Sequence, residues 1–225
     1  LSLMLCGCLI SSVLVDIPTA IILAGIALPL LKESGCEPGK SRYGKAVMIG
    51  IPISAALGGI GTPAGSGLNI LTINLLNNVA GKNITFMQWT AIGFPMAIIL
   101  VLIAWFVIIL VFKPEIDTVK GLDDIKSKRK ELGPMSKNEK KFLVIFIIVM
   151  VMWFTQSMTG IETAFASLLA VCVFFLPGVD LMDWNTAKES ISWDSVLLMG
   201  SANALAMILS TQGTAEWISN SILGS

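Results

Sequence analysis

The stretch GGIGTPAGSG, residues 58–67, lies in the middle of an apolar segment, residues 46–78, that is otherwise long enough to cross a membrane as a helix. Five of its ten residues are glycine and one is proline, so a continuous helix is not expected there. Irregular backbone at membrane depth is tolerated only where protein buries it or where it lines a wet cavity. The segment therefore predicts a helix over 46–57, an unwound loop over 58–67 and a second helix over 68–79.

The composition is that of a membrane protein. Hydrophobic residues make up 55% of the 225 residues and charged residues 13%, about half the share found in an ordinary soluble domain. The apolar residues come in blocks, and about 20 of them in a row span a bilayer core as a helix. We therefore expect an all-α polytopic membrane protein, with further spans at 91–112, 141–158 and 161–177. Trp89, just before the first of these, is expected near the lipid headgroups.

Lysine and arginine are concentrated in two segments. Of the 15 basic residues, four fall in 32–45 and nine in 113–141. Because cytoplasmic loops near span ends carry the excess of basic residues, we expect both segments to be cytoplasmic. Residues 113–141 then form a linker between parts 1–112 and 142–225. The formal net charge is zero and there is no histidine, so nothing favours nucleic acid as a partner or a histidine-based metal site.

A second interruption precedes the glycine-rich loop. Residues 11–31, SSVLVDIPTAIILAGIALPLL, are apolar except for one carboxylate, Asp16, which Pro18 follows closely. Proline removes a helical hydrogen bond, so the segment is either a kinked span or a re-entrant hairpin of two short helices that turns at VDIPT. A charge at the bilayer centre costs about 2.5–3.5 kcal/mol, so Asp16 is expected to ligate a cation or to titrate. The alternative is that Asp16 caps the helix that follows.

Two interrupted apolar segments so close in sequence point to the binding site of a transporter. Free carbonyl oxygens at such breaks bind Na⁺, whereas the amide ends of half-helices attract an anion. The loop offers the side chains of Thr62, Ser66 and Asn69, and the carbonyl of a glycine such as Gly61. No lysine follows in the pattern of a phosphate-binding loop, and no nucleophile–base pair is present, so an enzyme is not expected. The alternative is a channel or scaffold subunit whose glycines only permit tight packing.

These motifs resemble those of the divalent anion/sodium symporter family, which carries dicarboxylates, citrate or sulfate together with sodium. In that family a re-entrant hairpin carries S-x-x-x-S-N-T at its tip, and a loop that often reads G-G-x-G-T-x-x-G-[ST]-x-x-N breaks the next helix. Ser11 matches the first hairpin serine, whereas Val15, Asp16 and Ile17 stand in place of Ser-Asn-Thr. The Asp-x-Pro sequence is similar to hairpins of superfamily relatives that exchange Na⁺ for H⁺ or export arsenite. The loop matches at Gly58, Gly59, Gly61, Thr62, Gly65, Ser66 and Asn69.

The resemblance implies that both breaks contribute to one transport site, with Na⁺ as coupling ion and no cofactor. The expected sodium-binding residues are Ser11, Val15, Asp16, Gly61 and Asn69. The expected substrate-binding residues are Asp16, Ile17, Pro18, Thr19, Thr62 and Ser66.

The resemblance also implies an inverted-repeat architecture. Residues 1–112 would hold the hairpin, the broken helix and the following span of the first repeat, and residues 142–225 would begin the second. The chain would then be an internal fragment of a carrier that forms a homodimer and moves as an elevator. The expected function is secondary active transport of a small anion (di- or tricarboxylate, or sulfate-like) with Na⁺, in the plasma or inner membrane. A H⁺-coupled or Na⁺/H⁺-exchanging relative is the alternative within the superfamily.

Overall fold

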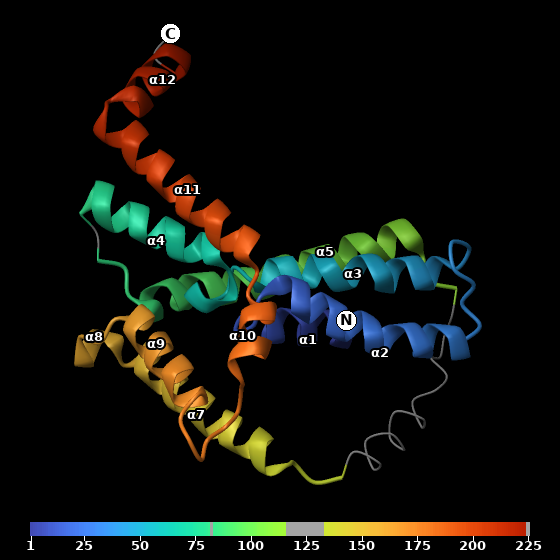
Figure 1. Ribbon diagram of the computed structural model, residues 1–225. Coiled ribbons are helices and arrows are strands. Elements are labelled where there is room, and N and C mark those ends of the chain that lie inside the picture. The colour runs from blue at the N-terminus through green and yellow to red at the C-terminus, as the bar shows by residue number, and fades with distance from the viewer. Residues whose placement is uncertain (82, 116–132, 224–225) are drawn as a thin grey trace.

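The computed structural model describes residues 1–81, 83–115 and 133–223, and every regular element in these ranges is helical (Figure 1). The predicted all-α class is therefore confirmed for this part of the chain, while most of the expected linker 113–141 lies outside it. The elements are α1 (Ser2–Ser11), α2 (Asp16–Glu33), α3 (Arg42–Gly58), the 3-10 turn η1 (Pro63–Gly65), α4 (Gly67–Ala80), α5 (Phe86–Phe112), α7 (Lys137–Phe154), α8 (Gln156–Thr159), α9 (Thr163–Phe174), α10 (Trp184–Ser190), α11 (Trp193–Thr211) and α12 (Thr214–Leu223).

The first interruption separates α1 from α2, but it falls earlier than predicted. The non-helical residues are 12–15, and α2 already begins at Asp16. The expected turn at VDIPT is therefore wrong by a few residues. Pro18 is the third residue of α2, within the first turn, where a helix leaves its backbone N–H groups without intrahelical partners. Proline is thus compatible with the start of this helix, and Asp16 lies at the end that the helix dipole makes favourable for an acid.

The second interruption matches the prediction closely. Helix α3 ends at Gly58 and α4 begins at Gly67, with η1 between them. Thr62 caps η1 by accepting a hydrogen bond from the N–H of Ala64, and Ser66 caps α4 by accepting one from the N–H of Leu68. The polar side chains of the loop therefore start new helical segments where the glycines end the old one.

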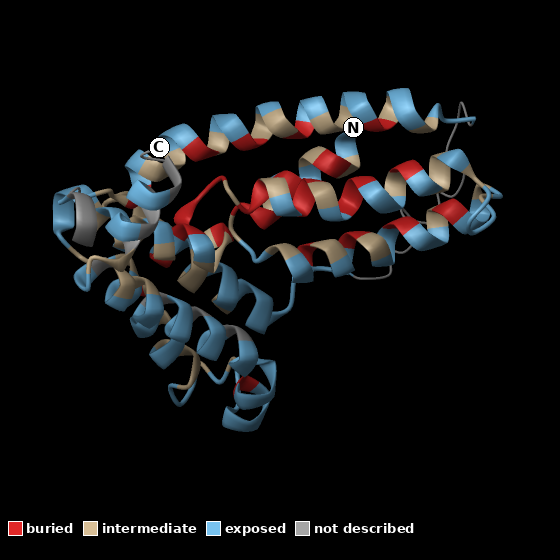
Figure 2. Cartoon of the chain, turned by 90° about the horizontal axis from the view of Figure 1, so that it is seen from above, coloured by how far each residue is buried: buried red, intermediate tan, exposed pale blue. Residues whose placement is uncertain are grey.

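Helix α3 is the centre of the packing. It contacts α1, α2 and α5, and these four helices lie side by side in Figure 1. The buried residues gather around α3 and the following loop, as the red segments of Figure 2 show. One buried cluster joins α1, α3 and α5 and contains Met4, Cys8, Ala46, Ala97, Val101 and Ile108. A second cluster joins α2 to α3 and contains Leu23, Ala27 and Ile51.

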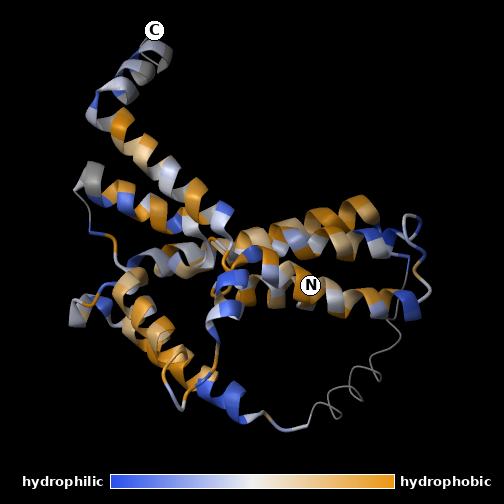
Figure 3. Ribbon diagram, viewed as in Figure 1, coloured by the Kyte–Doolittle hydropathy of each residue, from blue (hydrophilic) through white to orange (hydrophobic). Residues whose placement is uncertain are grey.

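The outer faces of the helices are apolar as well (Figure 3). On α5, for example, the side chains of Ile92 and Val111 are 74% and 66% exposed. Helix α5 has 27 residues without a charge, and it is the one helix in the described ranges that is long and apolar enough to cross a membrane by itself.

The two later spans that we predicted correspond to α7 and α9. Helix α7 has 18 residues but begins with a charged turn, and the short α8 follows it. Helix α9 has 12 residues, about 18 Å at 1.5 Å per residue, which is less than the bilayer core of about 30 Å. Helix α11 lies against α4, and α12 continues from it (Figure 1).

Candidate functional site at the two helix breaks

The two breaks are in direct contact. The hydroxyl Oγ1 of Thr62 donates a hydrogen bond of 2.5 Å to the carbonyl oxygen of Ser12, which joins the loop to the turn between α1 and α2. Next to it, Oγ of Ser11 donates one of 2.6 Å to the carbonyl oxygen of Ala55 in the last turn of α3. Ser11, Ser12 and Thr62 are all buried. The carboxyl ends of α1 and α3 are therefore tied together by side chains that lie at the breaks.

The glycines allow the two backbones to approach closely. A Cβ on Gly58 would lie 2.4 Å from the carbonyl oxygen of Cys8, and a Cβ on Gly65 would lie 2.9 Å from that of Ser11. Real Cβ atoms do not tolerate the shorter of these separations, so a side chain at Gly58 would push α1 away. The loop glycines do not adopt positive φ. Close approach of main chain to main chain is therefore what requires them.

Asn69 holds the loop in shape from the first turn of α4. Its Nδ2 donates hydrogen bonds of 2.7 Å to the carbonyl oxygens of both Gly59 and Thr62. Both bonds use the amide nitrogen, so Oδ1 makes no hydrogen bond to the part of the chain that the structure describes. The residue is buried, and an amide oxygen is a suitable ligand for a hard cation.

Helix α5 supports the loop from the other side. The indole Nε1 of Trp89 donates a hydrogen bond of 3.0 Å to the carbonyl oxygen of Ile60. A Cβ on Gly93, one turn further along, would lie 2.7 Å from the same oxygen. Sequence reasoning missed this contact, because an indole just before a span is typical of the headgroup region. The available signal was the spacing of Trp89 and Gly93, because residues four apart lie on the same face of a helix.

The other predicted hairpin residues have local partners. Oδ1 of Asp16 accepts a hydrogen bond of 3.0 Å from the N–H of Ile17, but Asp16 is the first residue of α2 and no side chain caps this helix. Oγ1 of Thr19 donates one of 3.1 Å to the carbonyl of Val15, within the same turn. The side chains of Val15 and Ile17 are 51% and 67% exposed. Within the described residues, no hydrogen bond links any of these side chains, or that of the exposed Pro18, to the loop.

Of the predicted site residues, the structure thus brings together Ser11, Gly61, Thr62 and Asn69. The missing Cβ of Gly61 would lie 3.2 Å from Cβ of Ser12, so this glycine also faces the turn between α1 and α2. Ser12 belongs to the same contact although only its neighbour Ser11 was predicted. Ser66 caps α4 next to this group, through the N–H of Leu68 at 3.3 Å.

Two helices end and two helices begin at the breaks, so partial charges of both signs lie there. Helices α1 and α3 end there, and the carbonyl groups at the end of a helix carry partial negative charge, which favours a cation. Helices α2 and α4 begin there, and the amide groups at the start of a helix carry partial positive charge, which favours an anion. One pair of breaks therefore offers ligands for both kinds of ion.

Comparison with known proteins defines the class. Residues 6–225 match the family described as the sodium:sulfate symporter transmembrane region, and the chain belongs to this family. It is therefore part of an integral plasma membrane protein, and the family consists of transporters and not of enzymes, as the sequence predicted.

The names of individual relatives are more specific than the description of the family. The chain is similar to the sodium-dependent dicarboxylate transporter SdcS of Staphylococcus saprophyticus, at 29% identity over 84% of this chain and 40% of that protein. The corresponding SdcS of Staphylococcus aureus is 25% identical over 92% of this chain and 43% of the relative. A membrane protein of Cupriavidus necator is 23% identical over 80% of this chain and 35% of its own length. The chain thus spans less than half the length of these curated relatives.

Proposed function

We propose that this chain forms half of the transport site of a sodium-coupled carrier for a small dianion, a dicarboxylate or sulfate. One observation carries the proposal: the two interruptions of apolar helices meet, with the hydroxyl of Thr62 bonded to the carbonyl of Ser12. The family description names sodium and sulfate, and the two staphylococcal relatives are named sodium-dependent dicarboxylate transporters. These names support Na⁺ as the coupling ion and a divalent anion as the substrate.

In this proposal Na⁺ binds at the carboxyl ends of α1 and α3. The ligands are Oδ1 of Asn69, the carbonyl of Gly61 and main-chain oxygens of the hairpin turn between Ser11 and Val15. A carbonyl that already accepts one hydrogen bond still has a second lone pair for a cation. The bound ion bridges the hairpin and the loop, so it stabilises their contact.

The anion binds at the amino ends of α2 and α4, near the hydroxyls of Thr62 and Ser66. Asp16 introduces a negative charge at the start of α2, where the anion is attracted by the helix dipole. Two like charges in that region repel each other, so the anion binds well only after Na⁺ offsets the charge of Asp16. This charge balance would couple the binding of the anion to that of sodium.

The remaining features of the proposal concern the whole carrier. An inverted repeat would supply the second half of the site, and residues 142–225 would begin that repeat. The carrier would be a homodimer with an elevator motion, and the segments 32–45 and 113–141 would face the cytoplasm. The concentration of basic residues in these two segments supports this orientation.

The test is uptake of radiolabelled succinate and sulfate by vesicles that contain the intact protein. We expect uptake that depends on an inward Na⁺ gradient and that unlabelled dicarboxylate or sulfate inhibits. Uptake driven equally well by a proton gradient without Na⁺ would favour the H⁺-coupled alternative instead. Passive flux without coupling to either gradient would favour a channel, and no flux with well-folded protein would favour a scaffold.

A further inference from the structure

The beginning of α7 carries three lysines on one helix face. Lys137, Lys140 and Lys141 are spaced three and four residues apart, so they lie on the same side of the helix. Val144 and Ile145 continue that side by one more turn. Figure 3 shows the change along α7 from a hydrophilic first turn to a hydrophobic body. A single stripe thus passes from basic to apolar within two helical turns.

This stripe lines a groove between α7 and the end of α9. The groove is shallow and open, with a volume of about 550 Å³; the lysines line it with their aliphatic stems, and Val173 and Val179 form its other wall. Nζ of Lys141 donates hydrogen bonds of 2.8 Å and 2.9 Å to the carbonyl oxygens of Gly178 and Val179, which fixes the loop after α9 against α7. The groove is therefore formed by two elements that Lys141 holds together.

The ammonium groups of two of the lysines are free to bind an anion. Lys137 and Lys140 are exposed, and neither forms an ion pair within the described parts of the chain. The closest acid in sequence, Glu139, accepts a hydrogen bond of 2.7 Å from the N–H of Ser136 and is thereby held in the helix cap. Asp180, in the loop after α9, accepts one from the N–H of Gly178 at 3.1 Å.

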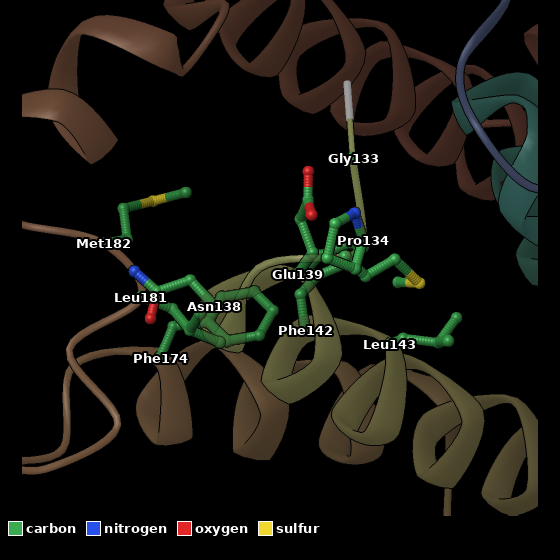
Figure 4. A pocket seen from close by; sticks show the side chains of 10 residues that line it. Gly133, Pro134, Asn138, Glu139, Phe142, Leu143, Phe174, Leu181 and Met182 are labelled. Atoms are coloured by element: carbon green, nitrogen blue, oxygen red, sulfur yellow. The ribbon is translucent and has the colours of Figure 1, made fainter. Parts of the chain in front are cut away.

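The opposite side of α7 differs in its chemistry. A hollow of about 710 Å³ lies there, where the rings of Phe142 and Phe174 face each other with centroids 5.9 Å apart (Figure 4). Glu139 lines this hollow and brings a carboxylate to its edge (Figure 4). An anion is thus favoured on the lysine side of α7 and disfavoured on the Glu139 side.

We propose that the groove binds an anionic phospholipid of the cytoplasmic leaflet, with its phosphate between Lys137 and Lys140. The acyl chains would lie along Val144 and continue over Ile148 and Val151, which are on the same stripe and more than half exposed. A basic pocket beside membrane helices at the cytoplasmic side is suited to such headgroups. Positive charge at the rim with apolar surface below matches a lipid and not a free phosphate, which would gain nothing from the valines.

The test measures phosphatidylglycerol retained by the intact protein in detergent, by native mass spectrometry with the lipid added in steps. The variant is Lys137→Gln/Lys140→Gln, and the matched control is Lys32→Gln/Lys45→Gln, which removes two exposed lysines from the other basic segment. We expect the affinity to fall about 30-fold in the groove variant, about fivefold for each lysine, and to change little in the control. Melting temperatures of both variants confirm folding. The readout needs neither sodium nor substrate, so it is independent of the transport proposal.

A second variant tests the apolar part of the groove. Val144→Asn should weaken retention of phosphatidylglycerol while leaving the weak binding of glycerol phosphate unchanged. Wild-type retention by the lysine variant would overturn the proposal. An equal loss in the control would also overturn it, because diffuse surface charge would then be responsible. Displacement of the lipid by glycerol phosphate at equal concentration would show that the groove recognises the phosphate alone.

Discussion

The carboxylate of Glu115 holds the start of α3, where its Oε1 accepts a hydrogen bond of 2.6 Å from Oγ of Ser41. The same oxygen accepts one of 2.8 Å from the N–H of Arg42, and Oε2 accepts one of 3.1 Å from the N–H of Tyr43. Glu115 follows the end of α5, so one side chain ties this end to the first turn of the helix that leads to the glycine-rich loop. Because α5 also supports the loop through Trp89, the two helices are joined at both ends.

This cap predicts a specific acid sensitivity. The hydroxyl of Ser41, and after it the backbone amides of Tyr43 and Arg42, hold the pKa of Glu115 below its ordinary value. A carboxylate whose pKa is lower in the folded state stabilises the fold above its unfolded pKa, and this contribution is lost as the pH falls through the folded pKa. We therefore expect the melting temperature of the wild type to fall more steeply below about pH 4.5 than that of Glu115→Gln. Parallel pH profiles in thermal unfolding would contradict this role.

Gly58 should not tolerate even one methyl group. In Gly58→Ala the new Cβ would overlap the carbonyl oxygen of Cys8, so α1 and α3 must separate at a cost of about 1–3 kcal/mol. The control is Gly25→Ala in α2, where a Cβ would meet nothing within 4 Å. We expect the control to be neutral or to gain about 0.5–1 kcal/mol, because alanine favours a helix over glycine. Thermal unfolding measures the stability of both variants, and equal stability would contradict the close approach of the two backbones.

Thr62 should matter through its hydroxyl and not through its shape. Thr62→Val keeps the volume but leaves the buried carbonyl of Ser12 without its partner, at a cost of about 1–3 kcal/mol. Thr62→Ser keeps the hydroxyl and is the control. We expect Na⁺ to raise the melting temperature of the wild type and of the serine variant, and to raise that of the valine variant much less. If Na⁺ raised the melting temperature of Thr62→Val as much as that of the wild type, sodium binding would not depend on the hydrogen bond between Thr62 and Ser12.

Asp16 should act through its charge. Asp16→Asn removes the charge and keeps an oxygen that can accept the hydrogen bond from the N–H of Ile17. The sodium concentration for half-maximal uptake should rise about fivefold, which corresponds to about 1 kcal/mol. Anion binding in the absence of Na⁺ should become stronger, since the repulsion is gone. If both quantities stayed at wild-type values, the charge of Asp16 would have no part in the coupling.

Much of the fold could be predicted from the sequence. The break after Gly58 is encoded locally, because glycine and proline oppose a helix wherever they cluster, and the structure places it within one residue of the prediction. The break near Asp16 was predicted too far along the chain. Proline disfavours a helix interior but fits a first turn, and the sequence pattern around Pro18 did not distinguish the two positions.

The candidate site was predicted less completely. Thr62 and Asn69 were found because they are polar residues within an apolar segment. Ser12 and Trp89 were missed because their roles depend on partners 50 and 29 residues away, Thr62 and Ile60. No local pattern specifies such pairs, since they depend on how four helices pack.

The sequence by itself determined that this is a helical membrane chain with two interrupted segments, because apolar content and glycine or proline content act residue by residue. Only the tertiary structure decided that the interruptions meet. The contact of Gly58 with Cys8 and the hydrogen bond from Thr62 to Ser12 exist because α1 packs against α3 at backbone distance. Packing of this kind sums many weak contacts between distant residues, so it is a property of the assembled helices and not of any single stretch.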